Sequence, residues 1–503
     1  MNNNNVLLLK CLLLLSLGFS NWNGSLYAQR ILEVGQGRTY ADPAQAARNA
    51  LPGDTILIYP GSYRGSFFIE NLKGTPNAWI TMKGTNRDAV IFAGGSQSMQ
   101  FTDAQYLFIQ DLTITGQTGN GLNIDDGGTY NTPTKRLVLK NLIFRDMAAS
   151  GNNDMLKLSG LDSFQIINCS FTNGATGGSG IDMVGCHAGD ITQCKFTNQG
   201  SNSIQAKGAT SEIHINRNHF INGGQRSINL GGSTGVDFFR PLGANYEARN
   251  LLVSANIFEG SMTPIAYVGC RNVTVINNTI IRPERWIMRI LQESPDTSFY
   301  QSSAYNYFIN NIVVVNSSLS TDVNIGPNTL PSSFTFENNL WYHETNANYR
   351  PTLPVTERNG ITRRNPGFVM LNGINYGITP NSPAYQAGAL TGNNLEDYFG
   401  RLFQFFPGPS IGALEYIAPN QTQDASSDIR IHVYPNPTSD FLLIESNEKI
   451  LQVNIVDMDG RILETIIDEK DMKRISVQNL KFGVYILEFK TSQGSSSKFF
   501  YKL

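Results

Sequence analysis

Short runs of apolar residues recur along most of the chain in one pattern. Two or three strand-forming residues are followed by Asn or a small substitute, one variable residue and then a large apolar residue. Successive copies lie 22 to 38 residues apart, and a period of roughly 20 to 50 residues indicates a stacked repeat architecture. The nine copies end at Ile114, Phe144, Phe171, Phe196, Phe220, Phe258, Ile280, Val313 and Trp341.

The residues between these copies predict strands, not helices. Each copy follows one strand, a second strand lies between copies, and Gly, Asn, Asp and Ser fill the gaps. The pattern predicts an all-β fold, a right-handed parallel β-helix in which each coil buries its apolar column against neighbouring coils. Residues 55–59 form the first clear strand. One short helix is expected over residues 41–51, where it would cap the open end of the coils.

Alternation along the second strand puts apolar residues inward and one file of polar residues outward. This file gives one surface of the coils a mixed charge, with Lys207 beside it. A column of Asn residues at the start of the later copies predicts a buried amide ladder, in which each side chain bonds to the next coil. The file consists of Asn123, Lys157, Asp182, Gln205, Asn229 and Arg289, and the ladder of Asn218, Asn256, Asn278, Asn311 and Asn339.

The chain divides into four predicted segments. Residues 1–28 are expected to be a signal peptide, since Lys10 precedes an apolar run at residues 12–17 that is too short to span a membrane. Residues 29–416 are the β-helix with an N-terminal cap and a closing segment, residues 417–428 are a polar linker, and residues 429–503 are a small β-sandwich domain.

Composition excludes several classes of function. The net charge of −2 gives no basis for nucleic-acid binding, and no later segment resembles a membrane span. Cys169 and Cys194 share a repeat position in successive coils and are expected to be small buried residues, with a disulfide not required. The chain has no zinc-type Cys/His spacing, nucleotide-binding loop or nucleophile elbow, so any chemistry must come from the polar file.

The longest interval between copies contains an insertion loop, residues 231–249, which leaves the polar file next to Asn229. It contains Arg240, Tyr246 and Glu247. Loops on a rigid scaffold often contain functional residues, so these three are candidate substrate contacts.

The C-terminal segment resembles a known export signal. Residues 433–439 (Val-Tyr-Pro-Asn-Pro-Thr-Ser), 453–461 and 480–487 follow the order and spacing of the C-terminal sorting domain of the type IX secretion system. The resemblance implies a Bacteroidota-type cell and passage through the periplasm. The type IX machinery would be a partner, and the protein would be released or attached at the outer surface.

Residues 202–208 and 222–232 resemble the active-site coils of the chondroitinase B and alginate lyase family, and residues 53–63 and 74–80 are similar too. Lys207 falls on the family's Lys base. The family's Arg position falls on Gly231, which leaves Arg226 or Arg289 as substitutes. The family's calcium-binding Glu-x-Glu falls on Gly200 and Asn202, so calcium stays an open alternative whose family ligands are not matched, and no other cofactor is expected.

The resemblance implies β-elimination on an extracellular, uronate-containing polysaccharide. In such a reaction a base removes the C5 proton and cations neutralise the substrate carboxylate. Lys207 is the predicted base, and a lysine beside several arginines should have a lowered pKa. The predicted catalytic residues are Lys207, Arg226 and Arg289, and the predicted substrate contacts are Asp182, Gln205, Asn229, Arg240, Tyr246 and Glu247.

Two alternatives remain open. Hydrolysis needs two carboxylates, and Asp125 and Asp182 lie two coils apart, about 10 Å, at the wide end for an inverting pair. The chain could instead be a carbohydrate-binding or adhesive surface solenoid without catalysis, which the low density of carboxylates favours.

Overall fold

The computed structural model describes residues 29–503 with several gaps, and the predicted signal peptide and linker lie outside the described residues. The described residues form two compact units, one up to residue 391 together with 395–415 and one from residue 416 onward. The gaps are residues 295, 297, 392–394, 405–407, 417–430, 435–437, 439, 458–460, 468–470, 482, 493–494 and 503.

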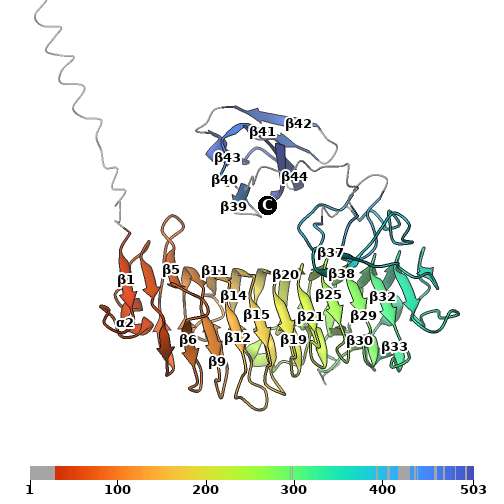
Figure 1. Ribbon diagram of the computed structural model, residues 1–503, viewed down its shortest axis with the longest axis horizontal. Coiled ribbons are helices and arrows are strands. Elements are labelled where there is room, and N and C mark those ends of the chain that lie inside the picture. The colour runs from red at the N-terminus through yellow and green to blue at the C-terminus, as the bar shows by residue number, and fades with distance from the viewer. Residues whose placement is uncertain are drawn as a thin grey trace, which may run out of the picture. The chain divides into compact units, whose positions relative to one another are not determined.

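The first unit is a row of coils, as the repeat pattern predicts (Figure 1). Each complete coil adds one strand to each of three parallel sheets and then rises to the next coil, so the fold is a right-handed parallel β-helix. Neighbouring strands in such a sheet lie about 4.8 Å apart, which fixes the spacing between coils.

The first sheet contains β1 (Ile31–Val34), β2 (Thr55–Ile58), β5 (Ile80–Gly84), β8 (Gln105–Gln110), β11 (Thr134–Lys140), β14 (Leu161–Ile167), β17 (His187–Thr192), β20 (Thr210–Asn216), β23 (Ala248–Arg249), β24 (Leu252–Ser254), β27 (Cys270–Arg271), β28 (Thr274–Ile276), β31 (Tyr307–Ile309) and β34 (Thr335–Glu337). The second sheet contains β3 (Gly61–Tyr63), β6 (Val90–Ala93), β9 (Thr113–Thr115), β12 (Ile143–Arg145), β15 (Ser170–Thr172), β18 (Lys195–Thr197), β21 (His219–Ile221), β25 (Ile257–Glu259), β29 (Thr279–Ile281), β32 (Ile312–Val315), β35 (Leu340–His343) and β36 (Ile361–Thr362). The third sheet contains β4 (Phe67–Glu70), β7 (Met99–Thr102), β10 (Leu122–Asp125), β13 (Leu156–Ser159), β16 (Ser179–Val184), β19 (Asn202–Lys207), β22 (Arg226–Gly231), β26 (Ile265–Val268), β30 (Trp286–Leu291) and β33 (Thr321–Ile325).

Asn residues form many of the corners between the first and second sheets. Asn141, Asn168 and Asn277 have φ of 56°, 52° and 53°, the left-handed region that Asn tolerates better than most residues. The corner side chains also bond along the coil axis, since Asn168 Nδ2 donates to Asn141 Oδ1 at 3.3 Å. The abundance of Asn at turns therefore has a direct conformational cause.

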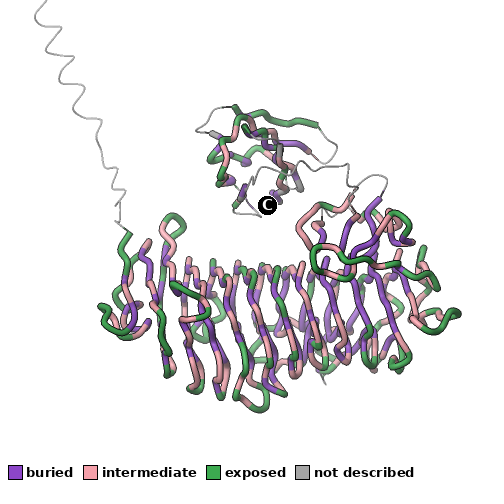
Figure 2. The backbone as a smooth tube through the Cα atoms, in the orientation of Figure 1, coloured by how far each residue is buried: buried purple, intermediate pink, exposed green. Residues whose placement is uncertain are grey.

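The apolar residues that end the repeat copies stack inside the coils, and Figure 2 shows the buried segments running through the row. Phe144, Phe171, Phe196, Phe220 and Phe258 form a continuous stack with ring centroids 4.7 to 5.0 Å apart and nearly parallel planes. All five are fully buried. The stacking distance matches the coil spacing, so every ring finds a partner above and below it.

The predicted Asn ladder is confirmed. Asn218, Asn256, Asn278 and Asn311 each donate through Nδ2 to the Oδ1 of the next Asn at 3.0 Å, and the ladder ends where Asn339 donates to Glu357 at 2.7 Å. Each Oδ1 also accepts the preceding coil's backbone N–H, as Asn278 does from Asn256 at 2.9 Å. The ladder therefore satisfies backbone and side-chain groups that are shut off from water.

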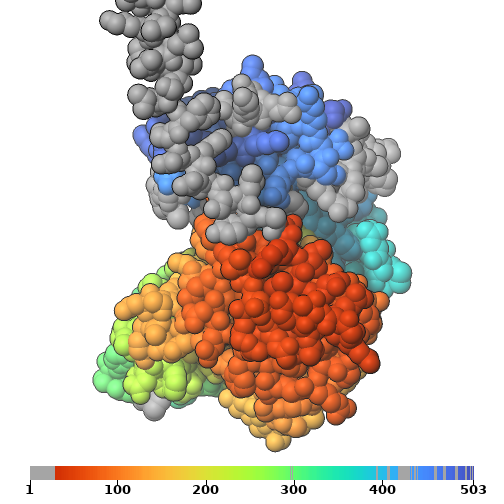
Figure 3. Space-filling view, turned by 90° about the vertical axis from the view of Figure 1, so that its left-hand side faces the viewer, coloured from red at the N-terminus to blue at the C-terminus, as the bar shows by residue number. Residues whose placement is uncertain are grey.

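The N-terminal end contains one strand more than the sequence indicated clearly. Strand β1 precedes the expected first strand and pairs with β2 in register. The helix is α2 (Pro43–Ala47), shorter than expected, with Asp42 accepting from Gln45 N at 2.9 Å as its N-cap. It lies against β1, β2 and β4, and Figure 3 looks onto this end, where N-terminal residues in red cover the coils.

The described residues between 365 and 415 fold back along the outside of the coils instead of adding further ones (Figure 1). The segment contains the hairpin β37 (Val369–Leu371) and β38 (Ile374–Gly377). Asn277 Nδ2 donates to Ser410 O at 2.8 Å, and Gly412 N donates to Asn310 O at the same distance. The closing segment therefore satisfies corner groups of coils far upstream in the chain.

The second unit is a small antiparallel β domain of two sheets. Its described core is apolar and separate from that of the coils, with Leu442, Val453, Leu487 and Phe500 among its buried residues. The sheets contain β39 (Ile431–Tyr434), β40 (Phe441–Ser446) and β43 (Arg474–Ser476), and β41 (Ile450–Val456), β42 (Ile462–Ile466), β44 (Gly483–Thr491) and β45 (Ser495–Lys502).

Three short 3-10 helices complete the described elements: η1 (Val236–Phe238), η2 (Pro331–Ser333) and η3 (Asp471–Lys473).

Cys169 and Cys194 lie in the position that Asn occupies in later coils, and both are free, buried thiols. Their sulfurs donate weakly to backbone carbonyls, Ile167 O and Thr192 O respectively, at 3.4 Å. They fill the ladder position as small buried residues, as the sequence predicts.

Replacing Asn278 with Ala should lower the free energy of unfolding by about 3 kcal/mol, because Asn256 and Asn311 would lose partners while remaining buried. Chemical unfolding followed by circular dichroism measures the change. The matched control is Asn348→Ala, at an exposed turn, which should change stability by less than about 0.5 kcal/mol. Equal effects of the two substitutions would contradict a stabilising ladder.

Candidate functional site

The predicted polar file runs along the third sheet in exact strand register. Lys157 on β13 pairs with Asp182 on β16, and Asp182 pairs with Gln205 on β19. Asn229 on β22 follows, then Ala266 interrupts the file before Arg289 on β30. Register places these side chains side by side along the coil axis, about 4.8 Å per coil.

Four charged residues of this file and its edges form one cluster, which we name the lysine–aspartate cluster: Asp154, Lys157, Asp182 and Lys207. Asp182 lies between the two lysines. Its Oδ2 bonds to Lys157 Nζ and lies 3.3 Å from Lys207 Nζ. Lys157 Nζ also lies 3.8 Å from Asp154 Oδ2. One carboxylate therefore links lysines that stand two coils apart.

The cluster is layered by burial. The side chains of Asp182 and Asp154 are 0% and 3% exposed, whereas those of Lys157 and Lys207 are 22% and 14% exposed. The lysine side chains are thus partly exposed, whereas both carboxylates are buried. Asp182 Oδ1 is buried and bonds to no atom of the described residues, so the second oxygen of this carboxylate is unsatisfied.

Burial and charge shift the protonation of the cluster. Burial raises the pKa of Asp154 to about 6, and the negative charge of Asp182 acts in the same direction. Burial opposes the charge on Lys157, but the carboxylates of Asp182 and Asp154 outweigh it and raise the pKa of this lysine. Lys157 is therefore a fixed positive charge at neutral pH.

Lys207 contacts Asp182 and Gln205, whose Oε1 lies 3.5 Å from Lys207 Nζ. The arginines that the sequence suggested as its neighbours make their contacts elsewhere. Arg226, one coil further on, donates to Asn229 Oδ1 at 2.9 Å and to Glu293 at 3.2 Å. The immediate charged partner of Lys207 is therefore an acid.

Arg289 lies on β30, three coils beyond the coil of Lys207. Its Nε donates to Asn324 at 2.9 Å, and its guanidinium carbon lies 4.6 Å from the ring centroid of Trp286. Arg289 does not pair with Glu247, whose side chain is fully buried.

The three candidates in the insertion loop anchor the loop from inside. Glu247 is fully buried and accepts from Gly208 N at 3.0 Å, Thr234 N at 2.8 Å and Ser294 Oγ at 3.0 Å. Arg240 is 8% exposed and pairs with Asp162, and its Nε donates to Gly185 O at 2.8 Å. These contacts leave little of either side chain for a polymer.

Tyr246 is also 8% exposed and packs in a small apolar group with Phe239, Tyr300 and Ala209. Arg249 lies over its ring at 4.5 Å. Its ring therefore holds the insertion loop against the coils. Phe238 of the same loop is 69% exposed and remains free to contact a ligand.

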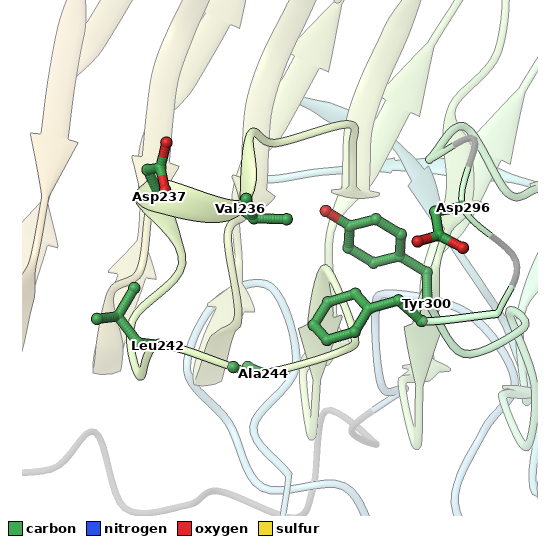
Figure 4. A pocket seen from close by; sticks show the side chains of 8 residues that line it. Val236, Asp237, Leu242, Ala244, Asp296 and Tyr300 are labelled. Atoms are coloured by element: carbon green, nitrogen blue, oxygen red, sulfur yellow. The ribbon is translucent and has the colours of Figure 1, made fainter.

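A pocket of about 420 Å³ lies on the outer side of the insertion loop, and Figure 4 shows Val236 and Tyr300 pointing into it from opposite sides. Its lining is mainly apolar, with Asp237 and Asp296 at the edge. It contains none of the lysine–aspartate cluster. The candidate site is therefore the polar file, not this pocket.

The sequence assigned no role in the site to Lys157, Arg285 or Trp286. Lys157 had a detectable signal, since it stands in the file directly beside an opposite charge, Asp182. Arg285 and Trp286 lie at a strand start after Pro283, where periodicity does not define which way a side chain points.

The residues present do not fit the calcium site of the lyases that the sequence resembles. Gly200 has no side chain, and Asn202 donates to Ser179 and Ser201 at 3.2 Å. Within the described part of the chain, no three His, Cys, Asp or Glu side chains come together in a way that could hold a metal ion. No step is therefore assigned to calcium.

Comparison with known families agrees with this architecture. The family described as "Right handed beta helix region" matches residues 89–280, and the family described as "Secretion system C-terminal sorting domain" matches residues 432–502. The chain is a right-handed β-helix protein with a type IX sorting domain. The sorting domain indicates export to the cell surface or the extracellular space. No helix of the described residues is long and apolar enough to cross a membrane.

Solved structures share the fold at low sequence identity. Pectate lyase Pel9A is 16% identical with a TM-score of 0.50, and the match covers 78% of this chain and 98% of that one. An alginate lyase from Paenibacillus sp. str. FPU-7 is 16% identical with a TM-score of 0.38, covering 62% of this chain and 98% of that one. A PL6 family polysaccharide lyase from Pseudopedobacter saltans is 13% identical with a TM-score of 0.38, and the match covers 67% of this chain and 91% of that one. No curated protein matches the chain.

The raised pKa of Asp154 predicts a pH-dependent stability. The native state holds this proton more tightly than the unfolded state, so the contribution is complete below pH 3.8 and is lost as the pH rises through about 6. Asp154→Asn removes this dependence. The melting temperature of the variant relative to wild type should rise between pH 4 and pH 7, measured by thermal unfolding across that range. A difference that is constant with pH would contradict the shift.

Proposed function

We propose that the protein is a polysaccharide lyase that cleaves an acidic, uronate-containing polysaccharide by β-elimination, with Lys207 as the base. The observation that carries the proposal is the difference in burial within the lysine–aspartate cluster, in which both lysine side chains are partly exposed and both carboxylates are buried. A polymer lying along the file meets lysines first. The shared fold with pectate lyase Pel9A supports the scaffold but not the activity.

The roles follow from this arrangement. Lys207 takes the C5 proton, the C4–O bond breaks, a double bond forms between C4 and C5, and the leaving oxygen takes a proton from water. Two cations lie on nearby coils: Lys157 stands in the file two coils before Lys207, and Arg226, one coil after it and in register with Asn202, reaches the file through its bond to Asn229. They neutralise the substrate carboxylate, which acidifies the C5 proton. Lys157 keeps Asp182 paired when Lys207 acts as the base.

Asn229 is buried and accepts from Arg226 at 2.9 Å, so the half-buried Gln205 supplies the polar contact of the file to the sugar. Phe238, exposed on the insertion loop, supplies an apolar one. Asp182 acts as a positioning residue, because its contacts are with both lysines and it has no exposure of its own. This assigns the exposed candidates to the substrate and the buried ones to the scaffold.

Hydrolysis is less well supported. Burial raises the pKa of Asp154 to about 6, as a general acid would require. However, hydrolysis needs both carboxyl groups beside the scissile bond, and the side chains of Asp154 and Asp182 are 3% and 0% exposed. A sugar could not reach them without displacing both amines.

The sorting domain supports an extracellular substrate. We propose that residues 1–28 direct passage into the periplasm and that residues 429–503 then engage the type IX machinery, with residues 417–428 as the linker between this domain and the coils. The mature protein is then released or attached at the outer surface, where polysaccharides are accessible.

The purified protein should produce unsaturated, ultraviolet-absorbing ends on at least one polymer among alginate, chondroitin, dermatan and pectate. Lys207→Ala should reduce the rate by about 10²- to 10⁴-fold, the range for loss of a general base. Lys207→Arg should reduce the rate by as much, because arginine keeps the positive charge but does not release its proton at neutral pH. The matched control is Lys140→Ala, an exposed lysine on the first sheet, which should leave the rate unchanged.

A parallel assay of reducing ends separates the alternatives. New reducing ends without ultraviolet absorbance would establish hydrolysis in place of elimination. Retention on a polymer with neither signal would identify a binding solenoid. Including a calcium chelator in one arm tests the metal independently, and the expected result is no loss of activity.

A further inference from the structure

A second cationic group lies on the third sheet, away from the lysine–aspartate cluster. Arg285 and Arg289 both lie over the indole of Trp286, with guanidinium carbons 4.2 and 4.6 Å from the ring centroid. We name these three residues the arginine–tryptophan cluster. Trp286 and Arg289 belong to β30, three coils beyond β19, so the cluster lies about 14 Å along the coil axis from the coil of Lys207.

Positive charge exceeds negative charge here. Burial lowers the pKa of Arg289, and the charges of Arg226 and Arg285 lower it further, while Glu293 acts in the opposite direction. Glu293 is already paired with Arg226. Arg226 and Arg285 thus act on Arg289 in the same direction, and the carboxylate of Glu293 opposes them. Like charges held close together repel one another, and a bound anionic ligand would reduce this repulsion.

Most N–H donors of the two guanidinium groups in the cluster make no hydrogen bond within the described residues. Arg289 bonds through Nε to Asn324, while its two terminal nitrogens donate to no atom of the described residues. Arg285 is exposed, and its guanidinium makes no hydrogen bond within the described residues. An arginine that served only to pack would pair its donors with nearby carbonyl groups. Here stacking on Trp286 holds both guanidinium groups in place while these donors make no hydrogen bond within the described residues.

We propose that Arg285, Trp286 and Arg289 form a binding subsite for an acidic group, a carboxylate or a sulfate ester, on a sugar of the polymer that is cleaved at Lys207. The inference rests on the proposed function and adds the direction in which the polymer binds. The polymer lies along the coil axis, from the lysine–aspartate cluster past Arg226 to β30. Planar guanidinium forks suit both carboxylate and sulfate oxygens.

Binding to a non-cleaving protein tests the subsite apart from catalysis. In the Lys207→Ala background, calorimetric titration with oligogalacturonate, alginate oligomers, unsulfated chondroitin and chondroitin sulfate should show binding to at least one. Fully methyl-esterified oligogalacturonate is the uncharged comparison and should bind weakly. A preference for chondroitin sulfate over unsulfated chondroitin identifies a sulfate ester, and equal binding of the two identifies the carboxylate.

Arg285→Met and Arg289→Met keep an unbranched apolar stem against Trp286 but remove the charge. Each should weaken binding about tenfold, the size expected for a lost charge-assisted hydrogen bond, and should reduce the dependence of affinity on salt. Arg282→Met is the matched control. It removes the same charge from an exposed arginine that pairs with Glu344 beyond the end of β29, and it should leave binding unchanged.

Binding and cleavage together distinguish a failure of the subsite proposal from a failure of the lyase proposal. If no oligomer binds the Lys207→Ala protein, or if Arg282→Met weakens binding as much as Arg285→Met and Arg289→Met, the subsite is overturned. If those two variants weaken binding but the wild-type protein forms no unsaturated ends on any polymer, the subsite stands and the lyase proposal falls. If the wild-type protein cleaves and those two variants bind normally, the lyase proposal stands and the subsite falls.

Discussion

In-register hydrogen bonding between successive coils is the constraint on which the rest of this structure depends. Because each strand pairs with its equivalent one coil away, every side chain stands about 4.8 Å from its counterparts. The interior uses this repeat to stack Phe rings and to join Asn side chains into a ladder. Both arrangements require identical residues at identical positions, so a one-residue slip would bury polar groups and expose apolar ones. The scaffold is rigid for that reason, and its outer surface inherits the same spacing.

The lysine–aspartate cluster is a consequence of this spacing on the outer side of the third sheet. Strand register places Lys157 next to Asp182, and Lys207 reaches the same carboxylate from the following coil. Burying a carboxylate requires compensating charge, and the two amines supply it. The arrangement buries the acids and leaves the lysines partly exposed, which favours elimination over hydrolysis as the chemistry of the surface. It also means that Asp182 holds both lysines in place.

The insertion loop shows the opposite use of charged residues. Its Glu247 and Arg240 are buried and bonded to backbone groups and to Asp162, so they fix the loop to the coils. Further along the third sheet, Arg285 and Arg289 stack on Trp286 with unused donors. Residues of the same chemical type thus hold the scaffold in one place and remain available to a ligand in another. The scaffold residues are buried and their hydrogen-bonding groups are paired, whereas the residues available to a ligand keep unpaired N–H donors.

The sequence by itself determined the coils, the polar file and the Asn ladder, because each follows from a local period that neighbouring coils repeat. It also identified the C-terminal sorting domain from the order of its motifs. It did not determine which charged residues meet. Arg240, Tyr246 and Glu247 were expected to face a polymer, yet loop packing buries them. Lys157 and Trp286 had no assigned role, yet the structure places one in the lysine–aspartate cluster and the other between two arginines. Periodicity specifies the face of a strand on which a side chain lies. The reach of a long side chain and the path of a loop depend on contacts between distant segments, which only the tertiary structure decides.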